Sequence, residues 1–465
     1  MIINILGVFK LNQAVLNKPM FTSKDLGKLL LPLIIEQFLA VAVGLADQIM
    51  VASVGEAAVS AVSLVDNISI LILNVFAALA TGGAVVAGQF IGQRNNELAN
   101  QSGKQLITLV TFISLIVMVV SYLLRNFITH VVFGNIEDDV THYSMIYMNI
   151  TFASIPFIAI YNAGAALFRA MSNSRITMVT SIVMNIINVT LNAVFIYGLK
   201  LGIEGVAIPT LISRVVAAGL IISLLFNKKL IINLKGKLSL KLNRYIVRNI
   251  LNIGIPNGAE SSMFQLGKII LLGIVSIFGT YAITANAVSN TISAIAVIPG
   301  ASIGLGMVTV ISHCVGAGDY EQARFYTKKL MKYSYLSMLM INIIIVLSLP
   351  FIIEIYHLSP KTAELAKEII IMHSVIACIL WAPAFILPNT LRASSDVLYT
   401  MVIGIGSMWI FRLGFGFLFG KFLNMGVMGV WFAMYLDWVV RSLFFYFRYK
   451  GPKWQFIRMR KLKSN

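Results

Sequence analysis

Twelve apolar runs, each long enough to cross a bilayer as a helix, dominate this sequence. A membrane helix needs about 20 predominantly apolar residues. The runs lie near residues 26–52, 57–88, 103–125, 143–169, 176–198, 205–227, 248–276, 281–314, 328–351, 365–391, 398–420 and 427–448. Only 12% of the residues are charged, whereas soluble proteins carry about 25%. Runs of helical length without alternation exclude an outer-membrane barrel. The sequence therefore predicts an all-α polytopic membrane protein.

The net charge of +18 is distributed unevenly along the chain. If the N-terminus is cytoplasmic, most lysines and arginines fall in inner loops, and the outer loops hold only Arg125, Lys200, Lys361, Lys367 and Lys421. Such a bias sets orientation, so we expect both termini in the cytoplasm of a bacterium and the spans in its plasma (inner) membrane. The positive charge then serves orientation and binding to anionic lipid, and nucleic acid is not expected as a partner.

The two halves of the chain repeat each other. Pro32 and Pro256 lie 224 positions apart, as do Glu36 and Glu260, and Gly55 and Gly279. Six spans per half give both halves the same orientation, so the fold expected is two parallel-repeat six-helix lobes around a central cavity near the midplane. The predicted boundaries are a cytoplasmic segment (1–25), a first lobe (26–227), a basic linker (228–247), a second lobe (248–448) and a basic tail (449–465).

Ionisable side chains inside the spans are the candidate functional residues. A charge at the bilayer centre costs about 2.5–3.5 kcal/mol or more, so one kept there indicates function. Asp47 is the candidate for ion coupling, since removing a carboxylate from water favours its protonated form. Asp66 and its repeat partner Asn290 are candidates for lining the cavity. We expect Arg214, Arg412 and Asp437 to pair internally or to reach toward the interface.

Glu36 and Glu260 each follow a proline by four residues. Two interpretations remain open for them: they complement the positive start of a helix, or they face the cavity and attract cations. Gln265 and Lys268 follow Glu260, and Lys268 is roughly 12 Å further along the helix axis on a similar face. This arrangement suggests an internal Glu260–Lys268 pair that breaks during transport.

The sequence shows no metal-ligand spacing, and Cys314 and Cys378 are expected to be packing residues. No GxxxxGK[ST] motif is present, so this chain alone cannot use ATP. We expect no enzymatic activity and no cofactor other than a proton or sodium ion for coupling.

Several segments resemble the multidrug and toxic compound extrusion (MATE) family. They are LPLIIEQFLAVAVGLADQIMVASVGEAAVSAVSLVD at residues 31–66, the end of the second span at Gly88, Gln89 and Gly92, NIINVTLNAVFIYGLKLGIEGVA at residues 185–207, and LPNTLRASSD in the second half. The resemblance implies a secondary-active exporter of cationic or amphipathic drugs, driven by entering protons or sodium ions. The chain is closer to the proton-coupled DinF-like branch, or to a related bacterial branch, than to the NorM-like branch.

The resemblance also implies residue roles. Asp47 stands at the family's first-helix coupling aspartate, Asn188 and Asn192 stand at its fifth-helix asparagine and aspartate, and Thr210 stands at its sixth-helix threonine. Asn192 replaces an acid, which weakens a sodium site. The stretch HSVIACILWAPAFILPNTL of the tenth span, residues 373–391, contains no acid, unlike the branch that uses one there.

The expected function is export of small organic cations or amphipathic compounds in exchange for protons or sodium, by a monomer in the lipid bilayer. The alternative is a flippase for lipid-linked oligosaccharide or lipid from the same superfamily. Such proteins usually need a strongly cationic cavity, which the several acids within the spans disfavour. A non-transporting scaffold is disfavoured by the duplication and the buried acids.

Overall fold

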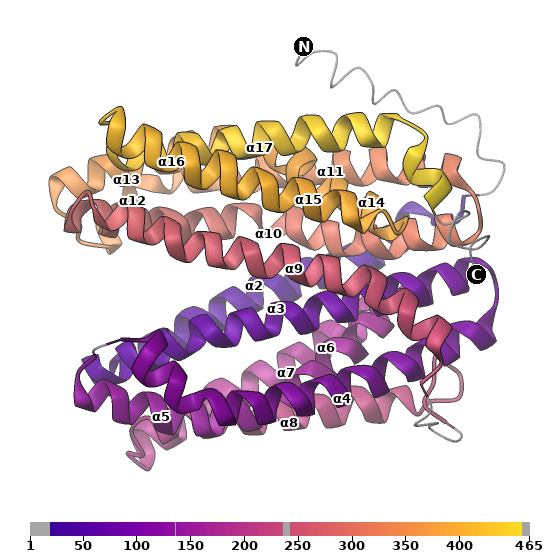
Figure 1. Ribbon diagram of the computed structural model, residues 1–465, viewed down its shortest axis with the longest axis horizontal. Coiled ribbons are helices and arrows are strands. Elements are labelled where there is room, and N and C mark those ends of the chain that lie inside the picture. Colours follow the sequence, from indigo (N-terminus) through magenta and orange to yellow (C-terminus); the bar gives the residue numbers. More distant parts are fainter. Residues whose placement is uncertain (1–18, 135, 236–241, 458–465) are drawn as a thin grey trace. The chain divides into compact units, whose positions relative to one another are not determined.

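A computed structural model describes residues 19–134, 136–235 and 242–457. The described chain is helical throughout its spans, and no strand occurs within those ranges (Figure 1). The predicted segments 1–25, 228–247 and 449–465 lie partly outside the described residues.

The first half contains seven α-helices and two π-helical segments. They are α2 (Ser23–Ala52), α3 (Glu56–Gly92), α4 (Asn96–Phe127), η2 (Ile128–Val132), α5 (Asp138–Ala153), α6 (Ile155–Ala170), α7 (Ser174–Ala193), η3 (Val194–Gly198) and α8 (Glu204–Leu225). The helices α5 and α6 are bent by 45° at Ser154, two residues before Pro156, and together they form one broken span. A proline near this point favours such a break, because it lacks a backbone N–H and clashes with the preceding turn.

The second half repeats this order, but its later spans are divided into several short α- and π-helical segments. Its elements are α9 (Arg244–Ser276), α10 (Thr280–Gly316), α11 (Tyr320–Leu347), α12 (Leu349–Ile355), α13 (Pro360–Trp381), η4 (Ala382–Ile386), α14 (Leu387–Ala393), α15 (Val397–Ser407), η5 (Met408–Gly414), α16 (Phe415–Phe417), η6 (Leu418–Phe422) and α17 (Gly426–Lys450). Pro383 lies in η4, and Pro388 is the second residue of α14. The tenth span is therefore irregular where its prolines lie.

The predicted fold class is confirmed. Among the described residues, eleven helices are long and apolar enough to cross a membrane, and the bent pair α5–α6 makes twelve. Their outer surfaces carry exposed apolar side chains such as Leu123 (77% exposed) and Leu347 (76% exposed). Surface this apolar is suited to contact with lipid.

The duplication is visible in the backbone. Every residue of the first half with positive φ has a counterpart 223 or 224 positions later among the described residues. The pairs are Gly55 and Gly279, Arg94 and Gly318, Gly134 and His357, Ser172 and Ser395, Lys200 and Asn424, and Gly202 and Gly426. Since side chains disfavour positive φ, this recurrence shows that both halves turn at the same places.

The helix caps repeat as well. Asn95 accepts a hydrogen bond from the Leu98 amide at 3.0 Å, and Asp319, 224 positions later, accepts one from Gln322 at 2.9 Å. Short polar side chains at this position satisfy amides that the first helical turn leaves unpaired. They start α4 and α11 several residues before the apolar runs from which these spans were predicted.

The described chain divides into two compact units. One comprises Leu31–Gly258, and the other comprises Ala259–Asn465 together with the chain up to Leu30. We call them the N-terminal and C-terminal units. The division falls within α2 and within α9, so each unit includes the start of the helix that continues in the other.

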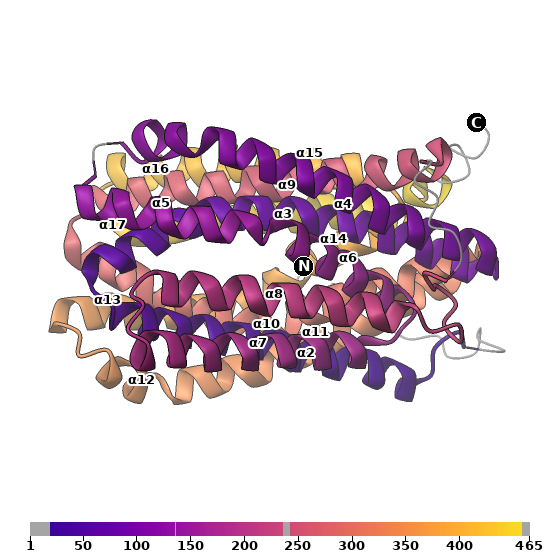
Figure 2. The ribbon, with the colours of Figure 1, turned by 90° about the horizontal axis from the view of Figure 1, so that it is seen from below.

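Within the N-terminal unit, α3 packs against α4, α5 and α6, and α7 packs against α8 (Figures 1 and 2). In the C-terminal unit, α10 packs against α11, α13 and α14. Close helix approach needs small residues in membranes. A Cβ atom on Gly82 of α3 would lie 2.7 Å from the Ile250 carbonyl oxygen and 2.9 Å from the Gly254 nitrogen on α9. This crossing therefore requires glycine.

Candidate functional site

Four side chains predicted to couple ion movement lie together in the N-terminal unit. The amide nitrogen of Asn192 donates to Asp47 at 2.9 Å and lies 3.4 Å from the Asn188 side-chain oxygen. Asn188 in turn donates to the Thr210 hydroxyl at 3.4 Å. The chain of contacts thus runs from α2 through α7 to α8. We call these four residues the Asp47 cluster.

The spacing along α7 explains how two amides reach one acid. Residues four apart lie on the same helix face, and both Asn188 (7% exposed) and Asn192 (1% exposed) are turned inward. Asp47 is half-buried, and the side-chain oxygen of Asn192 has no hydrogen-bond partner among the residues that the structure describes. Two residues after Asn192, at Val194, the helix changes to the wider π-helical segment η3. The cluster thus combines an acid of intermediate exposure with buried polar atoms.

A second acid lies beside this cluster. Asp66 on α3 is half-buried, accepts a hydrogen bond from the Tyr147 hydroxyl at 3.4 Å, and interacts electrostatically with Asp47 and Arg214. Arg214 donates to the Ser154 hydroxyl at 2.7 Å, where α5 meets α6. Sequence reasoning singled out Asp66 but missed Tyr147. The expectation that Arg214 would pair inside the protein is consistent with this contact.

Glu36 is held inside the N-terminal unit by two residues from other helices. Its carboxylate accepts a hydrogen bond from the Thr177 hydroxyl at 2.9 Å and lies 4.0 Å from an Arg169 nitrogen. The helix-start interpretation is wrong for Glu36, because α2 begins at Ser23, well before it. The same correction applies to Glu260, since α9 begins at Arg244.

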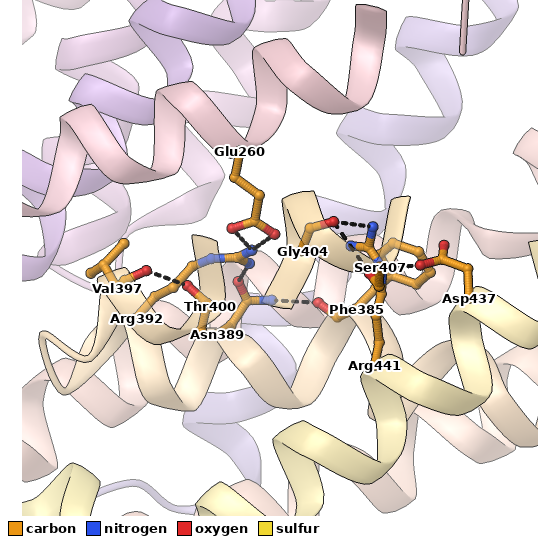
Figure 3. A network of polar contacts seen from close by, with 10 residues as sticks. All are labelled: Glu260, Phe385, Asn389, Arg392, Val397, Thr400, Gly404, Ser407, Asp437 and Arg441. Atoms are coloured by element: carbon orange, nitrogen blue, oxygen red, sulfur yellow. Dashed lines mark hydrogen bonds and ion pairs between the residues drawn. The ribbon is translucent and has the colours of Figure 1, made fainter. Parts of the chain in front are cut away.

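Glu260 forms a tighter version of this contact in the C-terminal unit (Figure 3). Both of its oxygens accept from Arg392 at 2.8 Å, and Arg392 also donates to Asn389 at 3.0 Å. The expected Glu260–Lys268 pair is therefore wrong. Two residues eight positions apart on one straight helix are about 12 Å apart along its axis, whereas Arg392 reaches Glu260 from α14.

A glycine makes room for this ion pair. A Cβ atom on Gly404 would lie 2.5 Å from a Glu260 oxygen, and the Gly404 carbonyl accepts from Arg441 at 2.7 Å. Arg441 is also paired with Asp437 at 2.8 Å. Figure 3 shows the two ion pairs on either side of Gly404. Gly404, on α15, therefore leaves room for the ion pair between α9 and α14, and its carbonyl binds the arginine of α17.

The remaining candidates of the second half are not brought into these pairs. Lys268 is exposed, and Gln265 is half-buried. Asn290 is exposed, and its amide donates to the carbonyl of Asn286 in the same helix at 2.8 Å. Their roles stay predictions. Among the described residues, no group of three or more His, Cys, Asp or Glu side chains could hold a metal ion.

Comparison with known proteins identifies two copies of one family domain. The MatE family model matches residues 32–194 and again residues 256–418, so the second match begins and ends 224 positions after the first. This offset is the one that the sequence pairs predicted. Together the two matches cover well over half of the chain.

Curated relatives match along nearly their whole length. The uncharacterized transporter YisQ of Bacillus subtilis is 27% identical, with 96% of this chain and 98% of that protein covered. The probable multidrug resistance protein NorM of Thermotoga maritima is 24% identical, with 93% of both chains covered.

Solved structures share the fold. An outward-facing multidrug resistance MATE family transporter superposes with a TM-score of 0.80 at 19% identity, covering 95% of this chain and 97% of that one. A MATE structure in complex with MaD5 gives a TM-score of 0.82 at 18% identity with the same coverage.

Proposed function

This chain belongs to the multidrug and toxic compound extrusion family, and from that premise we propose that it exports cationic or amphipathic small molecules in exchange for protons. Its duplicated membrane-spanning fold and its relatives named as multidrug resistance proteins support export as the direction of transport. One observation carries the choice of coupling group. Asp47 is an ionisable residue within a span, and it receives a hydrogen bond from the buried amide of Asn192.

The Asp47 cluster is suited to a proton because its only acid is Asp47. Binding of a proton neutralises a single carboxylate completely. A sodium ion needs several oxygen ligands, and here the Asn192 side chain presents its nitrogen to Asp47. An amide can hydrogen-bond a carboxyl group in either charge state, because its nitrogen donates and its oxygen accepts. Asn192 can therefore hold Asp47 in place before and after protonation.

Asp66 is the group to which we assign cargo binding, next to the proton-binding group Asp47. Because Asp66 and Asp47 interact electrostatically, a cation that approaches Asp66 makes the charged form of Asp47 more favourable. Cargo binding at Asp66 would then release the Asp47 proton, and protonation of Asp47 would weaken cargo binding. This linkage is the reciprocal coupling that an exchanger requires.

The orientation proposed for the chain follows from its loop charges. With both termini cytoplasmic, the lysine- and arginine-rich loops lie inside a bacterial cell, as the positive-inside bias requires. Protons entering from outside then drive cargo outward. We propose that the monomer in the bilayer is sufficient for this exchange.

Ethidium uptake into proteoliposomes tests the proposal. An exchanger moves cargo toward the compartment that protons leave, so vesicles with an acidic interior should accumulate this permanent cation from an alkaline medium. Vesicles loaded with sodium at equal pH on both sides should not. Accumulation driven by sodium alone would reject proton coupling, and accumulation under neither gradient would reject cation export.

A further inference from the structure

The starts of α2 and α11 lie against each other within the C-terminal unit. The ammonium group of Lys329 on α11 donates to the Ser23 hydroxyl, at the start of α2, at 2.9 Å. The Phe21 amide donates to the Tyr326 hydroxyl, one turn earlier on α11, at 2.7 Å. Both helix starts belong to the same compact unit. These contacts fix them relative to each other.

Lysines from both helices lie beside this junction. Lys24 and Lys28 are exposed on α2, and a Cβ atom on Gly27 between them would meet nothing within 4 Å. On α11, Lys332 is exposed and follows the half-buried Lys329 by three residues. Residues three or four apart share a helix face, so each helix presents a pair of ammonium groups. We call these four residues the lysine cluster.

The lysine cluster carries more charge than nearby acids balance. Asp25 lies in the first turn of α2, and Glu321 lies in the first turn of α11. Asp25 already accepts hydrogen bonds from the Thr22 hydroxyl at 2.7 Å and from the Thr22 amide at 2.9 Å. Neither Lys24 nor Lys332 forms a hydrogen bond or ion pair with the described residues. Four lysines thus face two acids, and positive charge remains.

An apolar stripe on α11 continues from the lysine cluster. Leu336, four residues after Lys332, is 57% exposed, and the stripe goes on through the exposed Met340 to Leu347. Exposed apolar surface of this kind suits contact with acyl chains. Grouped lysines at the end of such a surface are typical of binding to anionic lipid. The two chemistries together match one molecule that has an acidic headgroup and apolar chains.

The duplication shows that the fold itself does not require these lysines. In the first half, α4 carries an equivalent stripe, in which Phe112 is 59% exposed and lies 224 positions before Leu336. The positions equivalent to the lysine cluster, 224 residues away, hold Gln105, Thr108, Arg248 and Asn252. The same helix arrangement is therefore built with one cation in one half and four in the other. The additional charge has a use other than folding.

We propose that the lysine cluster binds the headgroup of an anionic phospholipid, whose acyl chains lie along Leu336 and Met340. A lipid fits better than soluble phosphate, because the charge adjoins an apolar stripe. This site goes beyond the proposed exchange of cations and does not depend on it. It belongs to the C-terminal unit, whereas the Asp47 cluster belongs to the N-terminal unit.

Photochemical cross-linking of the full-length protein tests the inference. A benzoylphenylalanine probe takes the place of Leu336 or, as the matched control, of Phe112. The vesicles consist of phosphatidylcholine with a minor share of phosphatidylglycerol in both leaflets, so the result does not depend on orientation. Mass spectrometry of the adducts should show phosphatidylglycerol enriched above its share in the vesicles at residue 336 but not at residue 112. Equal shares at both positions would overturn the proposal.

Paired substitutions locate the headgroup. Two lysines near an anionic headgroup are worth about thirtyfold in affinity, so Lys24→Gln/Lys332→Gln should bring the phosphatidylglycerol share at residue 336 down to that at residue 112. Lys24→Arg/Lys332→Arg keeps both charges and should keep the enrichment. Lys228→Gln/Lys229→Gln removes two exposed lysines of the other unit and should also keep it. Unchanged enrichment in Lys24→Gln/Lys332→Gln, or an equal loss in Lys228→Gln/Lys229→Gln, would refute a specific site.

Discussion

Breaking the Glu260–Arg392 ion pair should cost more than breaking its counterpart in the other half. Glu260→Gln leaves the Arg392 charge without its acid, and removal of one partner from a buried ion pair costs about 3–5 kcal/mol. The side chains of Arg392 and Glu260 are 15% and 10% exposed, and Arg392 keeps its hydrogen bond to Asn389. We therefore expect Glu260→Gln to lower the free energy of unfolding by about 3 kcal/mol, the lower end of this range.

Glu36→Gln is the matched control that the duplication supplies. Glu36 and Arg169 are 4.0 Å apart, compared with 2.8 Å for both oxygens of Glu260. A glutamine at this position keeps an oxygen for the Thr177 hydroxyl. The control should therefore lose only about 1 kcal/mol of unfolding free energy, the scale of one hydrogen bond, because the 4.0 Å separation already leaves the two charges weakly paired.

The assay is unfolding by sodium dodecyl sulfate in dodecyl maltoside micelles, followed by tryptophan fluorescence. The double variant Glu260→Gln/Arg392→Gln should recover part of the loss, because no uncompensated charge then remains. The reasoning would be refuted if Glu260→Gln were no more destabilising than Glu36→Gln. Strict additivity of the two single substitutions would also contradict it.

Three other substitutions test separate parts of the account. Gly404→Ala should displace the Glu260 carboxylate and lower unfolding stability about as much as Glu260→Gln, since a Cβ atom there would be 2.5 Å from a carboxylate oxygen. Gly82→Ala should force α3 and α9 apart and cost about 1–3 kcal/mol, the usual cost of overpacking, measured in the same unfolding assay. Asn192→Asp places a second carboxylate beside Asp47 and should make ethidium transport responsive to a sodium gradient, whereas unchanged sodium insensitivity would count against the ligand argument.

Hydropathy and repetition predicted the fold because they are local or periodic properties. The apolar runs located all twelve spans, and the shared offset between Pro32 and Pro256 anticipated the duplicated backbone turns. The Asp47 cluster was predictable because Asn188 and Asn192 share a helix face and the family resemblance assigned partners on other helices. What could not be read from the sequence is which charged side chains meet across helices.

Arg392 illustrates this limit. It was placed in an inner loop by its position after an apolar run, and Lys268 was chosen as the partner of Glu260 because both lie on one helix. The repeat did contain a signal, since Arg169-Ala170 and Arg392-Ala393 recur with nearly the same offset as Glu36 and Glu260. A pair of acids and a pair of arginines that repeat together indicate two equivalent ion pairs. The π-helical segment around Arg412 has no comparable sequence signal.

Transport by Asp47→Asn under an imposed pH gradient tests the central claim most directly. The substitution keeps the shape of the side chain and its contact with Asn192 but removes the group that takes up a proton. Vesicles with an acidic interior should then show no concentrative ethidium uptake, while wild-type protein in parallel vesicles accumulates the dye. Gradient-driven uptake at the wild-type rate in Asp47→Asn would contradict the account.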